Sequence, residues 1–575
     1  MPILDYFRRQ ETCKLLAGDE SALKARFERF RNFLRANRDS LADMATLEQC
    51  YHSGAPVGTP WVRAKTASLQ ERVREMASNL NALGRGRFET LESRVNDIMA
   101  TPGQAEPLLR PAGAVTRPLG TLLADDIAAV GAKAANLGIM GSRLGLRIPD
   151  GFAISRAGFE RFIESNGLRE ALDDLLAQWN ANDPAGNERV CARMRELVQD
   201  APVPEDLARE IISAYEALES RTRPGVRVAM RSSAVGEDTA ASFAGQYVSE
   251  LNVIRLGLLD AYKTVLASKY AARAIAYRLR LGLDDEDVPM CVLCIEMIDS
   301  RESGVLYSID PDAPESGMMR LAAVAGLGEL LVSGQVSPAT VLIDRQTLDP
   351  VRLEPGSGKV RLANIATGGT ELVVSAEDSA FLPAEEDMRE LAEAGLRIET
   401  HFGGPQDIEW TRDAQGRLFL LQARPLGIED AGPERADRPD LDGCTVLLDG
   451  GTQASRGIGQ GPVQLATSGT EIPQGAILVS RSASPDLATF MERLSGIVAE
   501  NGSVASHLAS VARECGVPMI VGCAGALDKL RPGQIVTLVA EHGAVIDGAP
   551  ESLREFAKHK PARIFDTPVA RRFRS

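Results

Sequence analysis

Two polar breaks rich in turn-forming residues constrain the fold of this chain of 575 residues more than any other feature. Residues 101–120 (TPGQAEPLLRPAGAVTRPLG) are rich in Pro and Gly, and residues 428–443 (IEDAGPERADRPDLDG) are polar and contain two prolines. Such composition is typical of linkers, and a chain of this length is expected to form several domains. The breaks predict a helical region at 1–105, globular domains at 106–430 and 440–557, and an exposed basic tail at 558–575.

The first region has the apolar spacing of amphipathic helices. Its apolar residues recur every three or four positions in two series: Leu23, Phe27, Phe30 and Leu34, then Leu69, Val73, Met76, Leu80 and Leu83. The second series is a short heptad seam, and Gly84 and Gly86 end it. Two interpretations stay open. The region is either a helical bundle that packs on itself or on the next domain, or an arm that docks a partner or forms a homo-oligomer.

The remaining chain mixes strand-like and helical patterns. Apolar, strand-like runs alternate with helical patterns over 106–430, which is typical of α/β or α+β architecture. Residues 440–557 carry short β-like runs, such as 476–479 and 535–539, and one glycine-containing turn that leads into a helix. The chain is therefore predicted to be a multidomain α+β protein.

Composition narrows the choice of partners. Hydrophobic residues make up 44% of the chain and charged residues 25%, which are ordinary values for a globular protein. The formal net charge of −15 argues against nucleic acid as a partner. The chain shows neither an apolar signal core at its start nor an apolar run of about 18 residues, so we expect no membrane association and a cytoplasmic location.

The cysteines do not suggest a metal site. Eight of them are scattered along the chain, which favours free thiols over a disulfide framework. Cys291 and Cys294 form one CxxC inside the apolar run 288–295, but neither a second pair nor a nearby histidine completes a zinc site. We predict that these two residues are buried thiols of a strand.

One of the five histidines, His507, stands in a context that favours chemistry. Residues 496–499 read as a buried strand, 500–503 as a turn, and 506–514 as a helix that Gly516 closes. The first turn of a helix favours anions, and a neutral imidazole is a nucleophile near pH 7. His507 therefore suits a phosphohistidine, although a structural histidine is compatible with the same spacing.

The sequence motifs around His507 resemble those of the swivelling phosphohistidine domain of the phosphoenolpyruvate synthase and pyruvate phosphate dikinase family. Residues 495–522 (SGIVAENGSVASHLASVARECGVPMIVG) follow the family pattern G-G-x-T-[SC]-H-A-A-x-x-A-R-x-x-G-[IV]-P, and residues 455–463 (SRGIGQGPV) resemble the glycine-rich opening of the same domain. Ala505 replaces the usual threonine. One phosphate contact is therefore expected from Ser503 or Ser506.

Residues 118–425 resemble the ATP-grasp nucleotide domain of the same family. The words that carry this resemblance are 130–138 (VGAKAANLG), 228–234 (VAMRSSA), 241–246 (ASFAGQ), 303–311 (SGVLYSIDP), 407–410 (DIEW) and 420–425 (LLQARP). Alternation along a strand places Asp407 and Glu409 on one face, and likewise Gln422 and Arg424. Two adjacent strands could thus offer the oxygens of Glu409 and Gln422 to Mg²⁺, which prefers oxygen ligands.

The resemblance implies a role for each of these residues. His507 would be the nucleophile, with Arg231 and Arg424 as its catalytic partners, because planar guanidinium groups suit phosphate oxygens and offset developing charge. The implied nucleotide contacts are Lys133, Arg231, Arg424 and Gln422 at the phosphates, Ser242 and Gly245 in a loop over them, Glu296 at the adenine and Glu329 near the ribose. The implied cofactors are ATP and Mg²⁺.

The resemblance also implies a reaction, that of a phosphotransferase with paired acceptors like the family's phosphoenolpyruvate synthases. ATP would give its β-phosphate to His507 and release AMP and phosphate. Too few residues follow Gly548 to form the family's pyruvate-binding barrel, so we expect the acceptor on a separate subunit or as an unidentified small molecule. A self-phosphorylating phosphocarrier or regulatory protein is the alternative, and a non-catalytic scaffold is the third hypothesis.

Overall fold

The computed structural model describes residues 20–53, 59–99, 113–180, 183–235, 247–280, 283–311, 313–336, 338–357, 360–374, 380–426, 441, 443–466, 472–504 and 506–554. They fall into two compact units. The first contains the described residues of Met1–Arg110 and Asp173–Pro184, and the second contains those of Pro111–Leu172 and Ala185–Phe565.

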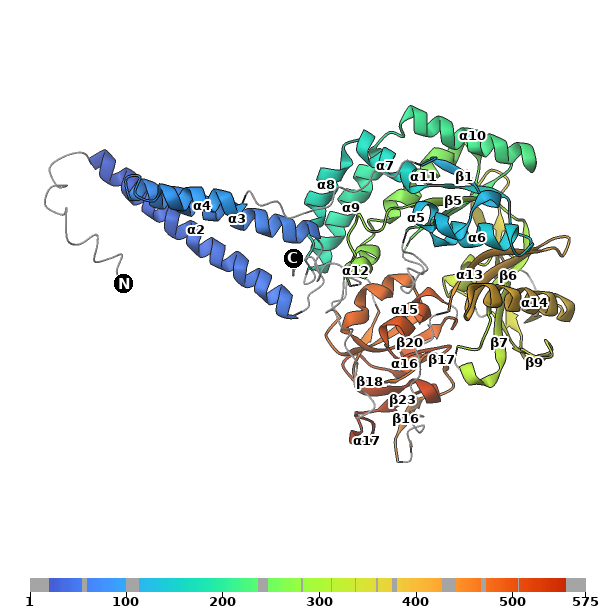
Figure 1. Cartoon of the computed structure of the whole chain (residues 1–575). Coiled ribbons are helices and arrows are strands. Elements are labelled where there is room, and N and C mark those ends of the chain that lie inside the picture. Colours follow the sequence, from blue (N-terminus) through green and yellow to red (C-terminus); the bar gives the residue numbers. More distant parts are fainter. Residues whose placement is uncertain are drawn as a thin grey trace. The chain divides into compact units, whose positions relative to one another are not determined.

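The first unit is built from helices α2 (Glu20–Ser53), α3 (Thr59–Leu83) and α4 (Glu89–Met99). Helices α2 and α3 lie side by side as a hairpin (Figure 1). The prediction of a helical region is confirmed for the described residues, and Gly84 and Gly86 lie between α3 and α4 as expected.

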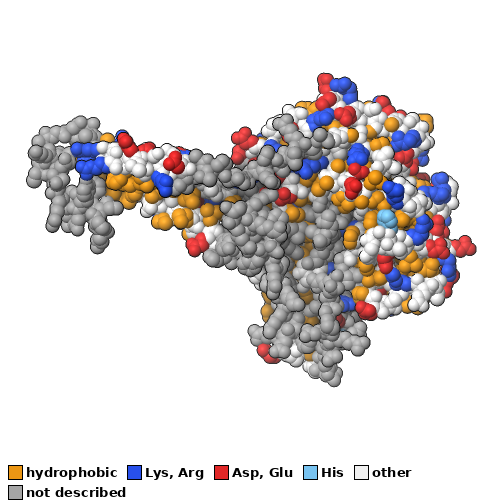
Figure 2. Space-filling view, viewed as in Figure 1, with side chains coloured by type: hydrophobic (Ala, Val, Ile, Leu, Met, Phe, Trp, Pro, Cys, Tyr) orange, Lys and Arg blue, Asp and Glu red, His pale blue; other side chains and the backbone are white. Residues whose placement is uncertain are grey.

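The apolar series at the start of α2 is exposed. Leu23, Phe27, Phe30 and Leu34 are 57%, 61%, 41% and 47% accessible to solvent. Figure 2 shows hydrophobic side chains gathered along one side of the hairpin. This series therefore does not form the contact between the helices of the hairpin.

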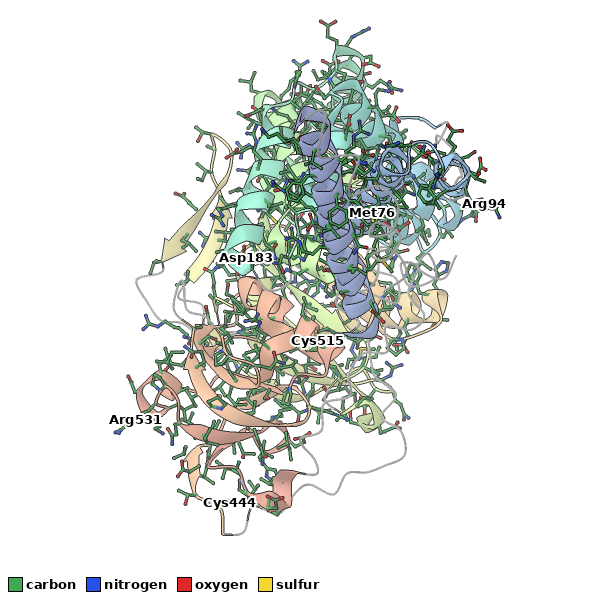
Figure 3. The ribbon with its side chains drawn as sticks, turned by 90° about the vertical axis from the view of Figure 1, so that its left-hand side faces the viewer. Met76, Arg94, Asp183, Cys444, Cys515 and Arg531 are labelled. Atoms are coloured by element: carbon green, nitrogen blue, oxygen red, sulfur yellow. The ribbon has the colours of Figure 1, made fainter. Side chains whose placement is uncertain are left out.

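A different face of α2 packs on α3. Ala36, Ser40 and Asp43 are buried there, and the Ser40 hydroxyl lies 3.8 Å from the sulfur of Met76, which Figure 3 labels. Asp43 accepts hydrogen bonds from Lys65 at 3.2 Å and from Ser68 at 3.1 Å. The polar groups on this inner face are thus satisfied within the hairpin.

The second unit begins with a five-stranded antiparallel sheet. Its strands, in spatial order, are β1 (Thr116–Pro118), β2 (Gly151–Ile154), β5 (Val292–Glu296), β3 (Val228–Ser232) and β4 (Ser249–Val253). The helices around it are α5 (Ile127–Val130), α6 (Ala132–Ser142), α7 (Arg156–Ser165), α8 (Leu168–Leu176), α9 (Pro184–Asp200), α10 (Glu205–Arg221), α11 (Leu258–Ser268) and α12 (Ala272–Arg280), with α8 running on into the residues assigned to the first unit. Cys291 and Cys294 are fully buried, as predicted, but only Cys294 lies in strand β5, which Cys291 directly precedes.

The first linker was predicted to extend to residue 120, and this boundary is wrong. Residues 116–118 form edge strand β1, which pairs with β2, and Leu119 and Leu122 are buried in the core. A proline at residue 118 is compatible with a strand here because β1 lies at the edge of its sheet. Most of the second predicted linker, namely residues 428–440 and 442, lies outside the described residues.

A second antiparallel sheet contains the motifs at 407–410 and 420–425. Its six strands, in spatial order, are β15 (Leu418–Pro425), β14 (Gln406–Asp413), β6 (Ser300–Tyr307), β7 (Met318–Ala325), β8 (Ala339–Asp344) and β9 (Pro350–Glu354). Helices α13 (Glu329–Val332) and α14 (Glu385–Phe402) and the hairpin of β11 (Val360–Asn364) and β12 (Thr370–Val374) accompany it. One hydrophobic core, which includes Leu137 of α6, Ile295 of β5 and Trp410 of β14, joins both sheets.

A third sheet of eight strands completes the second unit. Its spatial order is β16 (Val446–Leu448), β23 (Ala544–Asp547), β22 (Ile535–Val539), β18 (Ile458–Leu465), β19 (Ala476–Ser482), β20 (Leu494–Asn501), β21 (Met519–Val521) and β17 (Thr452–Ser455). Strands β18 to β21 are parallel along the sheet, and α15 (His507–Cys515) follows β20. The predicted α+β class is confirmed.

Among the described residues, no helix combines the length and the apolar character that crossing a membrane requires.

Candidate active site

One cavity of 360 Å³ collects most of the residues that the sequence singled out. The two antiparallel sheets, α6, α12 and α13 line it together with His507. The predicted site residues that line the cavity are Lys133, Arg231, Glu296, Glu329, Glu409, Gln422, Arg424 and His507. Ser242 and Gly245 lie outside the described residues.

The start of α6 holds Lys133 against the end of β3. Gly131 has φ +78°, and a Cβ atom built there would lie 2.0 Å from the carbonyl oxygen of Ser233. The Ser233 hydroxyl donates to the carbonyl oxygen of Val130 at 2.7 Å and accepts from the N–H of Ala134 at 3.2 Å. Only glycine tolerates this close approach with a positive φ. The glycine at residue 131 therefore lets the start of α6 lie against β3, which brings Lys133 to the cavity.

Strands β14 and β15 deliver four polar side chains to the cavity. In the register of the pair, Glu409 lies opposite Gln422, and Asp407 lies opposite Arg424. All four line the cavity, which agrees with the predicted alternation of faces. Helix α6 also contacts β15, because the side-chain amide of Asn136 donates a hydrogen bond to the carbonyl oxygen of Ala423 at 3.2 Å.

Arginines satisfy the oxygens of these strands. Nη2 of Arg231 donates to Oε2 of Glu409 at 2.6 Å and to Oε1 of Gln422 at 3.1 Å. Arg424 donates to Oδ2 of Asp407 through Nε at 2.9 Å and through Nη2 at 2.6 Å. Burial opposes ionisation of Glu409, but the charges of Arg231, Arg424 and Lys133 outweigh it and lower the pKa of this carboxyl. Glu409 is therefore an anion near neutral pH.

His507 is the first residue of α15, one position from the predicted helix start. Ser506 caps the helix, since its hydroxyl oxygen accepts from the N–H of Ala509 at 3.3 Å, and Gly516 ends it in the left-handed conformation. Burial, followed by the positive charge of Arg424, lowers the pKa of His507 to about 3. The imidazole is thus neutral at pH 7, which is the nucleophilic form.

The oxygens of Glu409 and Gln422 fit a hard cation. They lie close enough to share one guanidinium nitrogen of Arg231. No cluster of three or more His, Cys, Asp or Glu side chains that could hold a metal occurs among the described residues. One carboxylate and one amide oxygen match the way Mg²⁺ binds through few protein ligands plus phosphates, so Glu409 and Gln422 would hold it.

The two contacts implied for the nucleoside differ in their surroundings. The Glu296 carboxylate lines the cavity at the end of β5, but it also accepts a hydrogen bond from the N–H of Asp150 at 3.3 Å. The apolar wall beside it includes Ile295, Met297 and Leu331, and such a wall suits a flat ring. Glu329 is exposed at the start of α13.

Sequence reasoning missed Arg273 of α12. Arg273 lines the cavity with His507, and its charge contributes to the lowered pKa of that histidine. Nothing in the sequence indicated this role, because Arg273 lies in an amphipathic helix and no glycine-rich loop or strand motif stands beside it. Gly334 lies beside the histidine, since a Cβ atom added there would lie 3.3 Å from Ala483 and 3.4 Å from Ser506.

The family models match both parts of the second unit. Residues 127–441 match the family described as "Pyruvate phosphate dikinase, AMP/ATP-binding domain". This chain belongs to that family. Residues 472–543 match the family described as "PEP-utilising enzyme, mobile domain". The resemblance to this family that the sequence motifs indicated is therefore confirmed.

Curated relatives carry one name. The chain is 34% identical over 443 residues to the phosphoenolpyruvate synthase of Neisseria meningitidis serogroup B, which covers 73% of this chain and 56% of that protein. It is 33% identical over 441 residues to the enzyme of the same name from Escherichia coli K12, covering 73% and 55%. It is 32% identical over 444 residues to a probable phosphoenolpyruvate synthase of Methanothermobacter thermautotrophicus, covering 74% and 62%. The chain thus spans little more than half the length of these relatives.

Proposed function

We propose that this chain is an ATP-dependent phosphotransferase that phosphorylates its own His507 and passes the phosphoryl group to an acceptor. A neutral imidazole nitrogen of His507 attacks the β-phosphorus of ATP, and an N–P bond forms while the bond from the β-phosphorus to the oxygen bridging the α-phosphate breaks. AMP leaves with that oxygen. Water then takes the terminal phosphoryl group, which departs as phosphate and leaves phospho-His507.

The observation that supports this proposal most directly is the mixture of groups in one cavity. Lys133, Arg231 and Arg424 supply positive charge for a polyphosphate, and His507 supplies a nucleophile that burial, together with the charges of Arg424 and Lys133, keeps neutral. Cations arranged in advance around a reacting phosphoryl group stabilise the charge that develops in the transition state. A site that only bound nucleotide would have no need of the imidazole.

The cofactor assignment rests on Glu409 and Gln422. These two residues would hold Mg²⁺, which would offset the charge of the phosphates. Arg231, which bonds both residues, would hold their oxygens in position. We assign the nucleotide domain to residues 106–430 and the swivelling histidine domain to residues 440–557.

The acceptor is proposed to lie outside this cavity. A histidine that receives the phosphoryl group inside the cavity must face a different site to deliver it, so transfer requires the histidine domain to move. We propose that the acceptor is carried by a separate subunit or is a small molecule bound along that path.

Labelled ATP tests the reaction. The full chain is incubated with ATP labelled at the β- or the γ-phosphate, and acid-labile, base-stable label on the protein is counted. We expect the β-label on the protein and the γ-label in free phosphate, with no protein label in His507→Ala. The same label in His507→Ala, or γ-label on the wild-type protein, would show that the nucleophile or the attacked phosphorus is assigned wrongly.

A further inference from the structure

Helix α2 carries a second apolar face that the hairpin does not use. Its inner face, with Ala36, Ser40 and Asp43 buried, packs on α3. Six large apolar side chains lie on the other side, each between 41% and 61% exposed. This outer seam consists of Leu23, Phe27, Phe30, Leu34, Leu41 and Met44.

The spacing of the outer seam is that of a coiled coil. Residues 23, 30 and 44 fall on one series of sevens that residue 37 completes, and residues 27, 34 and 41 fall on a second series. A strict seven-residue repeat keeps the apolar side chains facing a second helix that winds around the first. A helix that packs on the flat surface of a domain shows apolar residues with a period of about 3.6 instead. Asn37 occupies one seam position, where a polar residue sets register between helices.

The outer seam exposes more contiguous apolar surface than is usual where a protein surface binds nothing. Scattered single apolar residues on a surface are ordinary, but a contiguous apolar stripe marks an interaction site. Figure 2 shows such a gathering of hydrophobic side chains along the hairpin. The seam therefore needs an occupant.

The charges beside the seam select that occupant. Lys24, Arg31 and Arg38 follow one flank at intervals of seven, and Arg26 lies on the other flank, in a chain whose net charge is −15. Arg38 also contacts the adjacent Asp39 at 3.0 Å, but a pair this exposed is weak. Antiparallel pairing of the seam with a second copy would place Lys24, Arg31 and Arg38 opposite one another, and parallel pairing would place Arg26 opposite Arg31. Both arrangements are unfavourable.

We propose that the outer seam of α2 binds an amphipathic helix of a partner protein whose flanking positions carry Asp or Glu. The seam would supply apolar contact, and the basic flank would select the acidic helix and fix its direction. This surface belongs to the first unit and to none of the residue ranges matched by either family description, so the inference does not depend on the phosphotransfer proposal.

Two synthetic helical peptides test the proposal on the full chain. Both have Ile and Leu in the seam positions; one has Glu in the flanking positions and the other has Lys. Fluorescence anisotropy at low salt should show at least tenfold tighter binding of the Glu peptide, and high salt should narrow that difference because exposed charges are screened.

Variants of the chain locate the site. The double variant Phe27→Gln/Leu34→Gln should weaken binding of the Glu peptide at least tenfold, since Gln keeps helix propensity but removes the seam. Leu372→Gln on β12 is the matched control, because Leu372 is as exposed as Leu23 at 57%, and should leave binding unchanged. The triple variant Lys24→Glu/Arg31→Glu/Arg38→Glu should reverse the preference toward the Lys peptide.

Four results would overturn the proposal. Equal affinity for the two peptides, or binding of neither, would remove the acidic helix as the occupant. Binding to vesicles of phosphatidylcholine with three-tenths phosphatidylglycerol that the double variant abolishes would assign the seam to a membrane. A dimer in sedimentation equilibrium that the double variant dissociates would assign it to a second copy.

Discussion

At the scale of single residues, the cavity is a network in which cations determine the state of the neighbouring groups. Arg231 bonds both Glu409 and Gln422, while Arg424 bonds Asp407 and stands near enough to His507 to disfavour its protonation. Arg231, Arg424 and Lys133 therefore keep Glu409 ionised, while burial, followed by the charge of Arg424, keeps His507 neutral. If this cluster binds phosphates as we propose, the cations that bind them also favour the nucleophilic form of His507.

The lowered pKa of His507 can be measured directly. Without nucleotide, the imidazole should show no titration midpoint between about pH 5 and 8, because its pKa of about 3 lies far below the ordinary value near 6.5. The unfolded chain would take up this proton below about pH 6.5 and the folded chain would not. This histidine therefore makes the fold less stable as the pH falls through that range.

The measurement is an NMR titration of the five histidine side chains, with His507→Asn identifying the relevant signal. A midpoint between pH 6 and 7 for His507 in the nucleotide-free protein would contradict its placement beside the cations.

The acidic and basic members of the network should both be needed for transfer. Glu409→Gln and Arg424→Gln are each expected to slow His507 phosphorylation by on the order of a hundredfold, because each removes a charge that stabilises the transferring group. The measurement is single-turnover labelling at saturating ATP. Arg417→Gln is the control, since Arg417 is 55% exposed and pairs with Asp413 outside the cavity. Rates within threefold of wild type for either cavity variant would contradict its role.

At the scale of elements, close backbone contacts deliver the side chains. Helix α6 can start where it does because Gly131 lets its backbone lie against Ser233 of the β3 end. Strands β14 and β15 present their polar residues to one side because their register pairs Glu409 with Gln422. The cap by Ser506 begins α15 at the reactive histidine.

Substituting Gly131 should break the delivery of Lys133. In Gly131→Ala, the new Cβ atom would lie 2.0 Å from a backbone oxygen at a φ of +78°, so we expect a lower melting temperature and at least tenfold weaker ATP binding. Gly145→Ala is the matched control, since Gly145 has a φ of +61° but nothing within 4 Å of the added atom. It should cost about 1 kcal/mol of stability from the backbone alone and leave ATP binding unchanged. Equal effects of the two variants in calorimetry would contradict the contact with Ser233.

At the scale of the whole molecule, the chain separates into two compact units with their own packing. The hairpin buries one face of α2, and the second unit has its own hydrophobic cores around both antiparallel sheets and the eight-stranded sheet. Every described residue that we assign to catalysis belongs to the second unit.

Removing residues 1–105 should therefore leave the chemistry in place. We expect the truncated chain to phosphorylate His507 from ATP within threefold of the full-chain rate, because it keeps all the lining residues of the cavity. The measurement is labelling from β-labelled ATP, with circular dichroism to establish that the truncated chain is folded. A folded truncated chain that no longer labels would place the helical region in the nucleotide site.

The sequence by itself determined the local features of this protein. The strand, turn and helix around His507, the alternation in 407–410 and 420–425, and the helices of the first region could all be read from periodicity, caps and glycines, because these signals act over a few residues. The nearby edge strand 116–118 was missed, since its short length and proline resemble a linker and only its pairing with β2 marks it as a strand.

Only the tertiary structure decided which residues meet. Residues 133, 231, 409, 422 and 507 line one cavity because three sheets bring them there across long stretches of chain, and Arg273 joins them from a helix that no motif marks. Pairing with α3 buried the face of α2 that carries Ala36, Ser40 and Asp43, and left the apolar seam exposed. Burial and long-range charge arise only when distant segments pack, so neither the pKa of His507 nor the free seam could be derived from local sequence.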